Sequence, residues 1–227
     1  MSFKQRGYNK DKPQGRVRDY KLFAIACEGI KREAEYFCHF DGIDRIKVDI
    51  IRDEEGHYNS SPAGVLSKVK KYIEEVGLSD EDSLWIVVDV DKWPREQLDE
   101  LHEYCKQYNN WNISISNPCF EVWLLFHKRE NLEDTDCSTP EVAKQSLHGL
   151  QVGGYCSLDY LPLMPNAIEY AKGNDTNSDH YYPNAKETKV YLLAEALLER
   201  IGLPRFEKFK LELLKLKPRK PRIKKKY

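Results

Sequence analysis

The stretch SLWIVVDVD, residues 83–91, indicates the fold most directly. It is rich in β-branched residues and apolar up to its first acid, as expected for a central strand of a parallel sheet that is buried on both faces. Three further short runs predict strands of the same sheet: KLFAIACEG (21–29), IDRIKVDII (43–51) and NISIS (112–116).

Segments with helical spacing separate these strands. They are IKREAEYFCHF (30–40), PAGVLSKVKKYIEEVG (62–77), PREQLDELHEYCKQYN (94–109) and PCFEVWLLFHK (118–128). Ser60 or Ser61 is expected to cap the second helix, which has Pro62 in its first turn. Strands that alternate with helices predict βαβ crossovers and therefore an open, mainly parallel α/β sheet with helices on both faces.

The chain divides into four expected parts. Residues 1–20 form a basic arm with little to bury, which is expected to be disordered. Residues 21–130 form the α/β core, and residues 131–204 a mainly helical region packed on it, ending with the clear helix NAKETKVYLLAEALLERIG (184–202). Residues 205–227 form a basic tail, of which KPRKPRIKKKY (217–227) is given no secondary structure.

Charge is distributed unevenly along the chain. The net charge is −1, yet residues 1–21 carry seven Lys/Arg against two Asp, and residues 205–227 carry eleven Lys/Arg against two Glu. The part between is therefore acidic. Clustered acids can hold divalent cations and basic ends can hold a polyanion, although basic termini are also often simply solvated. The tail residues predicted to contact phosphates are Lys217, Arg219, Lys220 and Arg222.

Several classes of protein and site are disfavoured by composition. No apolar run approaches the roughly 20 residues of a membrane-spanning helix, and the polar N-terminus lacks the apolar segment of a signal peptide. Six scattered cysteines without a CxxC pair are expected to be reduced thiols in the cytoplasm. The six histidines include no HxH or HxxxH, which disfavours zinc, and no GxxxxGK[ST] motif is present for nucleotide hydrolysis.

Acidic residues follow the predicted strands where the strands end. Glu28 closes the first strand, Asp89 and Asp91 close the third, and Glu121 lies beyond the fourth, at the start of a helix that Asn117 is expected to cap. The carboxyl ends of parallel strands share one edge, so these carboxylates are expected to converge there. Converging carboxylates call for hard cations, and two Mg²⁺ or Mn²⁺ ions are the familiar apparatus of phosphodiester cleavage.

Each acid also has a purely structural interpretation. A DxD at a strand end can cap a helix with one Asp and hold a loop with the other. Glu121 could face solvent and pair with Lys128 or Arg129 further along its helix. The joint placement of the acids at successive strand ends favours the metal site.

Five further residues are candidates for contact with a substrate. Lys31 and Arg32 could touch a phosphate or form a solvated helix face. Ser116 and Asn117 could position a ligand or simply make the turn into the next helix. His127 could shuttle a proton, although a structural histidine satisfied by the backbone is the favoured explanation.

Three segments resemble the signatures of RloB-like proteins. CEGIKREAEYFCHF (27–40) is similar to CEGxxTExxYFxxF, and DVDKW (89–93) and SNPCFEVWLLFH (116–127) follow in the family order. The segment SSPAGVLSKVKKYIEE is similar to a helix between the first two of these signatures in the family, and PNAKETKVYLLAEALL is similar to a late helix. The resemblance therefore covers roughly residues 17–202. Arg32 stands where the family usually has Thr.

The resemblance implies a Toprim-like fold related to the nuclease half of overcoming-lysogenization-defect proteins. It also implies a role in bacterial or archaeal phage defence or abortive infection, sometimes beside an SMC- or ABC-like ATPase. Carried over by motif, Glu28 matches the Glu that acts in acid–base chemistry or metal binding, and Asp89 and Asp91 match the metal-binding DxD pair. Glu121 matches the NPxFE glutamate. Glu33 matches the TE glutamate and is a further candidate metal ligand.

Sequence and resemblance together predict a metal-dependent nuclease acting on DNA or RNA. The alternative is a catalytically silent sensor subunit that binds nucleic acid or protein within an ATPase-containing complex. A phosphatase or a primase-like transferase would use the same metal site.

Overall fold

The computed structural model describes residues 19–29, 31–53, 58–90, 93–150 and 155–216. Several predictions fall outside this part of the chain. They concern Asp91, the N-terminal arm up to residue 18, and the tail residues Lys217, Arg219, Lys220 and Arg222. No helix in the described ranges is long and apolar enough to cross a membrane. All six cysteines fall in these ranges and carry free thiols.

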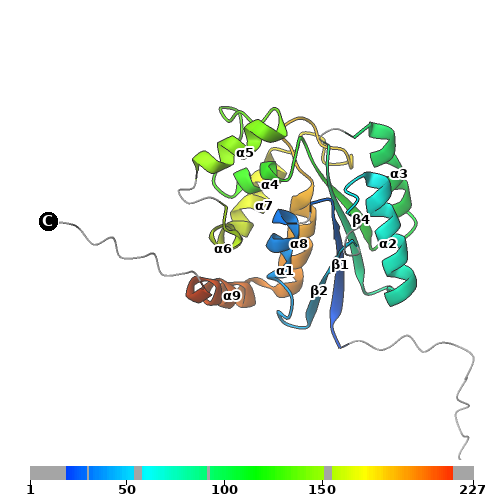
Figure 1. Cartoon of the computed structure of the whole chain (residues 1–227). Helices are drawn as coiled ribbons and strands as arrows, with labels where there is room; N and C mark the ends of the chain where they lie inside the picture. Colours follow the sequence, from blue (N-terminus) through cyan, green and yellow to red (C-terminus); the bar gives the residue numbers. More distant parts are fainter. Residues whose placement is uncertain (1–18, 30, 54–57, 91–92, 151–154, 217–227) are drawn as a thin grey trace, which may run out of the picture.

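Four parallel strands form the sheet at the centre of the molecule (Figure 1). They are β1 (Lys21–Cys27), β2 (Ile46–Ile51), β3 (Ser83–Asp89) and β4 (Trp111–Ser116), in the order β2-β1-β3-β4. All three neighbouring pairs are parallel. The open parallel α/β sheet predicted from the sequence is confirmed, and each predicted strand is present.

Helices cover both faces of the sheet, as the right-handed crossover rule requires. α2 (Pro62–Val76) and α3 (Arg95–Cys105) lie on one face, and α1 (Arg32–Cys38) and α4 (Glu121–Phe126) lie on the other side of the molecule (Figure 1). The Ser61 side chain accepts a hydrogen bond from the Gly64 N–H, which confirms the predicted cap of α2.

Alternation along the strands divides the core into two clusters. In β1, Ala24 and Ala26 face α2 and α3, whereas Phe23, Ile25 and Cys27 face α1 and the C-terminal helices. Successive strand side chains point to opposite faces, so a strand buried on both sides must be continuously apolar. This geometry explains the unbroken apolar runs in the sequence.

The C-terminal helices extend the larger of these clusters. They are α5 (Pro140–Gly149), α6 (Ser157–Tyr160), the 3₁₀ turn η1 (Leu161–Leu163), α7 (Met164–Gly173), α8 (Val190–Ile201) and α9 (Leu203–Leu216). α8 begins six residues later than the sequence predicts. The residues before it instead run beside the end of β4, where Thr188 forms an isolated bridge with Ser116.

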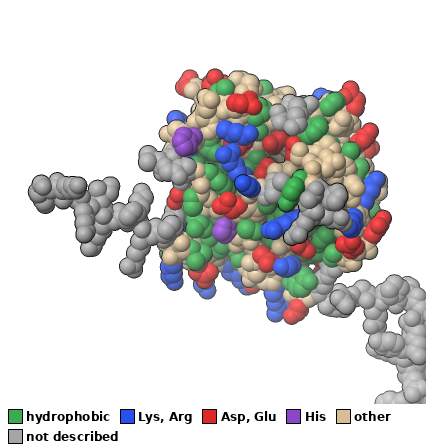
Figure 2. All heavy atoms as spheres, viewed as in Figure 1, with side chains coloured by type: hydrophobic (Ala, Val, Ile, Leu, Met, Phe, Trp, Pro, Cys, Tyr) green, Lys and Arg blue, Asp and Glu red, His purple; other side chains and the backbone are tan. Residues whose placement is uncertain are grey.

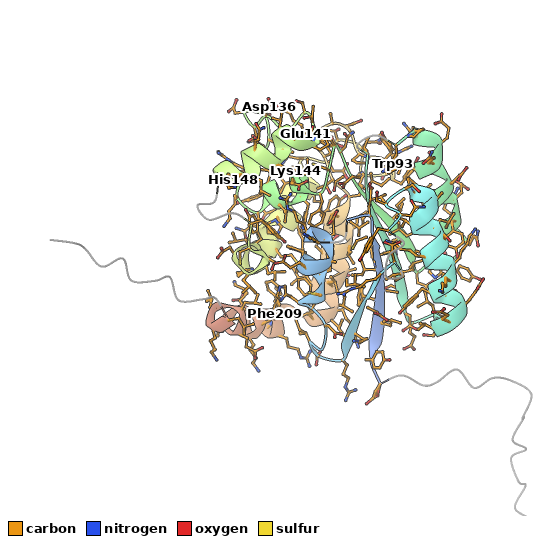
Figure 3. All side chains as sticks on the ribbon, viewed as in Figure 1. Trp93, Asp136, Glu141, Lys144, His148 and Phe209 are labelled. Atoms are coloured by element: carbon orange, nitrogen blue, oxygen red, sulfur yellow. The ribbon has the colours of Figure 1, made fainter. Side chains whose placement is uncertain are left out.

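The helical part extends beyond residue 204, where the sequence places the start of the basic tail. α9 continues to Leu216 and buries Phe206, Phe209 and Leu213. The signal for this helix in the sequence is its apolar residues at helical spacing, which the many basic residues of the segment obscure. Phe209 lies at the sheet-facing side of α9 (Figure 3), with its ring 5.5 Å from that of Phe40.

A buried ion pair holds the segment before α8. The side chains of Lys189 and Asp175 are both fully buried, and the Lys189 ammonium lies 2.6 Å from Oδ2 of Asp175. The ammonium also donates to the Asn177 carbonyl, and the Tyr191 hydroxyl donates to Asp175. Two desolvated charges are tolerated here because each has its opposite and further hydrogen bonds.

We expect Lys189→Ala to destabilise the protein by about 3–5 kcal/mol, because it leaves the Asp175 carboxylate buried without its cation. Lys172→Ala is the matched control, since Lys172 pairs with Glu195 on the surface and its loss should barely change the free energy of unfolding. Urea denaturation of both variants measures the difference. Equal midpoints would show that the buried pair contributes nothing.

Candidate functional site

The carboxyl ends of β1 and β3 bring two of the predicted acids together. Glu28 follows β1 directly, and its N–H donates to the Val87 carbonyl of β3 at 2.9 Å. Its Oε2 accepts a hydrogen bond from the N–H of Asp89 at 3.1 Å, and its Oε1 accepts one from the Trp93 indole at 2.8 Å. Glu28 therefore contacts the backbone of Asp89 at one edge of the sheet, and the convergence of their carboxylates stays a prediction.

Trp93 fixes the orientation of Glu28. It lies at the edge where the strands end (Figure 3), four residues beyond the end of β3. An indole N–H is a donor only, so it holds one carboxylate oxygen while the backbone of β3 holds the other. In the sequence, Trp93 is the last residue of the DVDKW segment, and nothing there indicates its contact with Glu28.

Glu33 lies beside the same strand end. Its side chain is buried, and burial raises the pKa of its carboxyl above the ordinary value. A β-carbon at position 29 would meet the Glu33 carboxylate, so a larger residue there would force this side chain to move.

Glu121 is paired with a cation from a distant segment. Its side chain is 5% exposed and forms an ion pair with Arg32, whose side chain is 38% exposed. The solvent-facing alternative, with Lys128 or Arg129 as partner, is wrong, because α4 is buried on all sides. A buried carboxylate needs a partner, and α1 provides it.

Two of the candidate substrate contacts, Arg32 and Lys31, lie at the start of α1. Arg32 also lies over the ring of Tyr155, 5.9 Å from its centroid, so the guanidinium is held from two sides. Lys31 occupies the N-cap of α1 and is exposed.

Ser116 and Asn117 make structural contacts at the end of β4. The Ser116 hydroxyl is buried against the hydroxyl of Thr188 at 2.8 Å, and the Asn117 side chain donates to the Pro183 carbonyl. The expected cap of α4 by Asn117 is wrong, because α4 begins at Glu121 with no side-chain cap. Both residues instead attach the segment before α8 to the sheet.

His127 is buried between α1 and α4. Its Nδ1 lies 3.0 Å from the Trp123 carbonyl, which can only accept, so Nδ1 carries the proton. Its Nε2 then accepts a hydrogen bond from the Tyr36 hydroxyl at 2.8 Å. Burial lowers the pKa of His127 to about 3, so this ring is neutral and structural in this geometry.

We expect His127 to make stability fall with acidification. Its folded pKa is depressed, so its contribution is complete above the unfolded value of about 6.5 and declines as pH falls from there toward 3. Between pH 7 and pH 5 the loss should be about 2 kcal/mol. Urea denaturation of the wild type and of His127→Gln at several pH values measures this loss. If the free energy of unfolding changed equally with pH in both proteins, this assignment would be contradicted.

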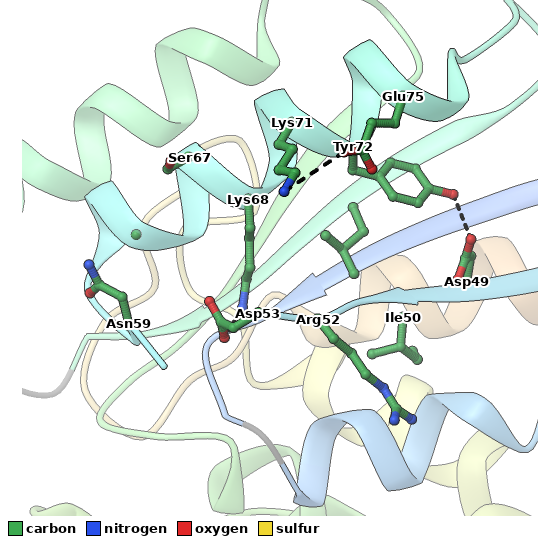
Figure 4. Close-up of a pocket in the computed structure, with 12 residues that line it drawn as sticks. Asp49, Ile50, Arg52, Asp53, Asn59, Ser67, Lys68, Lys71, Tyr72 and Glu75 are labelled. Atoms are coloured by element: carbon green, nitrogen blue, oxygen red, sulfur yellow. Dashed lines mark hydrogen bonds and ion pairs between the residues drawn. The ribbon is translucent and has the colours of Figure 1, made fainter. Parts of the chain in front are cut away.

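The sequence did not predict a buried lysine at the strand ends. Lys68 of α2 has a side chain only 9% exposed, and its ammonium donates to the Cys27 carbonyl at 2.8 Å and to Asp53 at 3.3 Å. In the sequence it stands in KVKKY, a pattern typical of a solvated helix face. Figure 4 shows its side chain extending from α2 to the strand end.

Charges of both signs are interspersed over the face of the molecule seen in Figure 2. Within residues 19–29, 31–53, 58–90, 93–150 and 155–216, no group of three or more His, Cys, Asp or Glu side chains is arranged to hold a metal ion. Asp91, which is also predicted as a metal ligand, is not among these residues.

Comparison with known families agrees with this arrangement. The family model of the RloB-like protein matches residues 23–197, which is most of the chain. The chain belongs to the RloB-like family. The match includes both strand ends that carry Glu28 and Asp89, and the helix that carries Glu121. Searches of curated proteins and of solved structures gave no match to this RloB-like protein.

Proposed function

We propose that this RloB-like protein is a metal-dependent nuclease that hydrolyses phosphodiester bonds of DNA or RNA, in bacterial or archaeal phage defence. The observation that carries the proposal is the contact of the Glu28 carboxylate with the N–H of Asp89, at the carboxyl ends of β1 and β3. Function in open α/β sheets is concentrated at this edge. Membership in the RloB-like family and the Toprim resemblance support the same proposal.

The donor set suits Mg²⁺ or Mn²⁺. Glu28 and Asp89 offer carboxylate oxygens from neighbouring strand ends, and Asp91 follows two residues later in the sequence. Such ions, when bound, activate water and stabilise the leaving oxygen. Glu28 is fixed by the N–H of Asp89 and by Trp93, and we assign it both ligand and acid–base roles.

Arg32 and Glu121 suit contact with the substrate phosphate. Glu121 holds the guanidinium, which remains 38% exposed four residues after Glu28. Arg binds phosphate oxygens well, so it can take the place of the Thr usual in the signature. In this role Glu121 anchors Arg32, and it would become a metal ligand only by releasing that cation.

We expect Asp89→Asn combined with Asp91→Asn to abolish cleavage while leaving the fold intact, because Asp89 lies at the end of β3 rather than in the core and each change replaces a carboxylate by an amide of similar size. The assay follows plasmid DNA, single-stranded DNA and a total tRNA pool with Mg²⁺ or Mn²⁺. Asp80→Asn combined with Asp134→Asn removes two exposed carboxylates elsewhere and should cut normally. Cleavage retained by the Asp89/Asp91 variant would overturn the mechanism.

A silent sensor subunit that docks an ATPase or a phage protein is the second candidate. The observation in its favour is the Arg32–Glu121 pair, because it neutralises one of the four predicted acids without a metal. A binding module of this kind has no need of divalent ions.

Thermal melting with and without Mn²⁺ separates the two candidates. For the nuclease, Mn²⁺ should raise the melting temperature of the wild type by mass action, and Glu28→Gln should remove most of that rise. A matched variant, Glu81→Gln, changes an exposed acid before the start of β3, away from the carboxyl ends of the strands, and should keep the rise in melting temperature. Melting curves of the wild type that do not respond to Mn²⁺ would favour the sensor.

A further inference from the structure

A cavity of about 330 Å³ lies beside the residue that follows Glu28. Gly29 forms part of its wall, Ala34 of α1 and Lys68 of α2 line opposite sides, and Ile50 and Ile51 of β2 line its base. A second cavity of about 500 Å³, between β2 and α2, shares part of this lining (Figure 4). The smaller volume is at the lower end of the range that proteins use for small organic ligands.

The described lining of the smaller cavity is positively charged. It contains Arg52, Lys68 and a single carboxylate, Asp53. Lys68 is largely satisfied by Asp53 and the Cys27 carbonyl, so its charge is fixed in place. Arg52 is exposed and makes no hydrogen bond or salt bridge with the described residues (Figure 4). Its guanidinium is therefore available to an anion.

The remaining walls are apolar, and an aromatic ring stands at the rim. Ala34, Ile50 and Ile51 provide an apolar surface, and Tyr58 lines the same cavity with 66% of its surface exposed. A ring this exposed offers a face on which a base can stack. A phosphate-binding cation, an apolar wall and a stacking ring together match one nucleotide.

We propose that this cavity receives a single unpaired nucleotide of the nucleic acid, next to the phosphodiester addressed by Glu28 and Asp89. The position of that bond rests on the proposed function. Arg52 binds the phosphate of this nucleotide and Tyr58 stacks on its base. A base within a duplex enters such a cavity only after it is unstacked and unpaired, which costs free energy that an unpaired base does not cost. The preferred substrate is therefore single-stranded, or carries unpaired nucleotides at the cleavage point.

Fluorescence anisotropy of the full chain with short labelled oligonucleotides tests this. Single-stranded DNA and RNA are compared with blunt duplexes of the same sequence, with Ca²⁺ as the oxygen-binding ion in place of Mg²⁺. Single strands should bind at least about tenfold more tightly than duplexes, and Tyr58→Ala should weaken their binding by about tenfold. Tyr58→Phe keeps the ring and should restore binding.

Two further variants complete the test. Arg52→Ala should lower the salt dependence of single-strand binding by about 0.7 in the slope of log K against log salt, which is one phosphate contact. Tyr108→Ala removes an aromatic residue of similar exposure, 53%, away from the cavity and should bind as the wild type does.

Equal binding of duplex and single strand, absent binding of both, or unchanged binding by Tyr58→Ala would overturn the inference. The nuclease proposal would survive these results if cleavage still depended on Asp89 and Asp91. Conversely, binding that depends on Tyr58 and Arg52 in a protein that cuts nothing would support the cavity and overturn the nuclease.

Discussion

The parallel pairing of β1 with β3 is the constraint on which the candidate site depends. Cys27, the last residue of β1, is in register with Val87, and β3 continues for two more residues, so the carboxylate of Glu28 reaches the N–H of Asp89. A slip of one residue would turn the side chains of a strand to opposite faces. Side-chain size opposes that slip in β1, because Ala24 and Ala26 face one cluster of the core and Phe23 and Ile25 face the other.

Around this edge, buried polar groups are satisfied by partners from distant segments. Glu121 pairs with Arg32, and His127 accepts from Tyr36, so α1 and α4 are joined by two polar contacts within an aromatic core. An unpaired charge or ring nitrogen in this position would cost several kcal/mol. These contacts fix the segments that follow β1 and β4, and with them the rim on which a substrate would rest.

The chemistry available at the rim follows from its charges. Glu28 and Asp89 lie at the ends of β1 and β3, while Arg32, Arg52 and Lys68 place cations on the helices and loops around them. Acids beside cations would suit a site that handles a metal ion and a phosphate, because carboxylates attract the metal ion and the cations attract the phosphate. This pairing of charges supports the proposed nuclease without excluding a binding module.

The sequence by itself determined the parallel sheet and the places of Glu28 and Asp89 where two of its strands end, because apolar runs and strand ends are local properties of the chain. It did not reveal the partner of Glu121, which lies 89 residues away, or the burial of Lys68 and Lys189. Nor did it indicate the cavity between α1 and α2. Whether a charge is solvated, paired or buried depends on which segments pack against it, and the tertiary structure alone decides that.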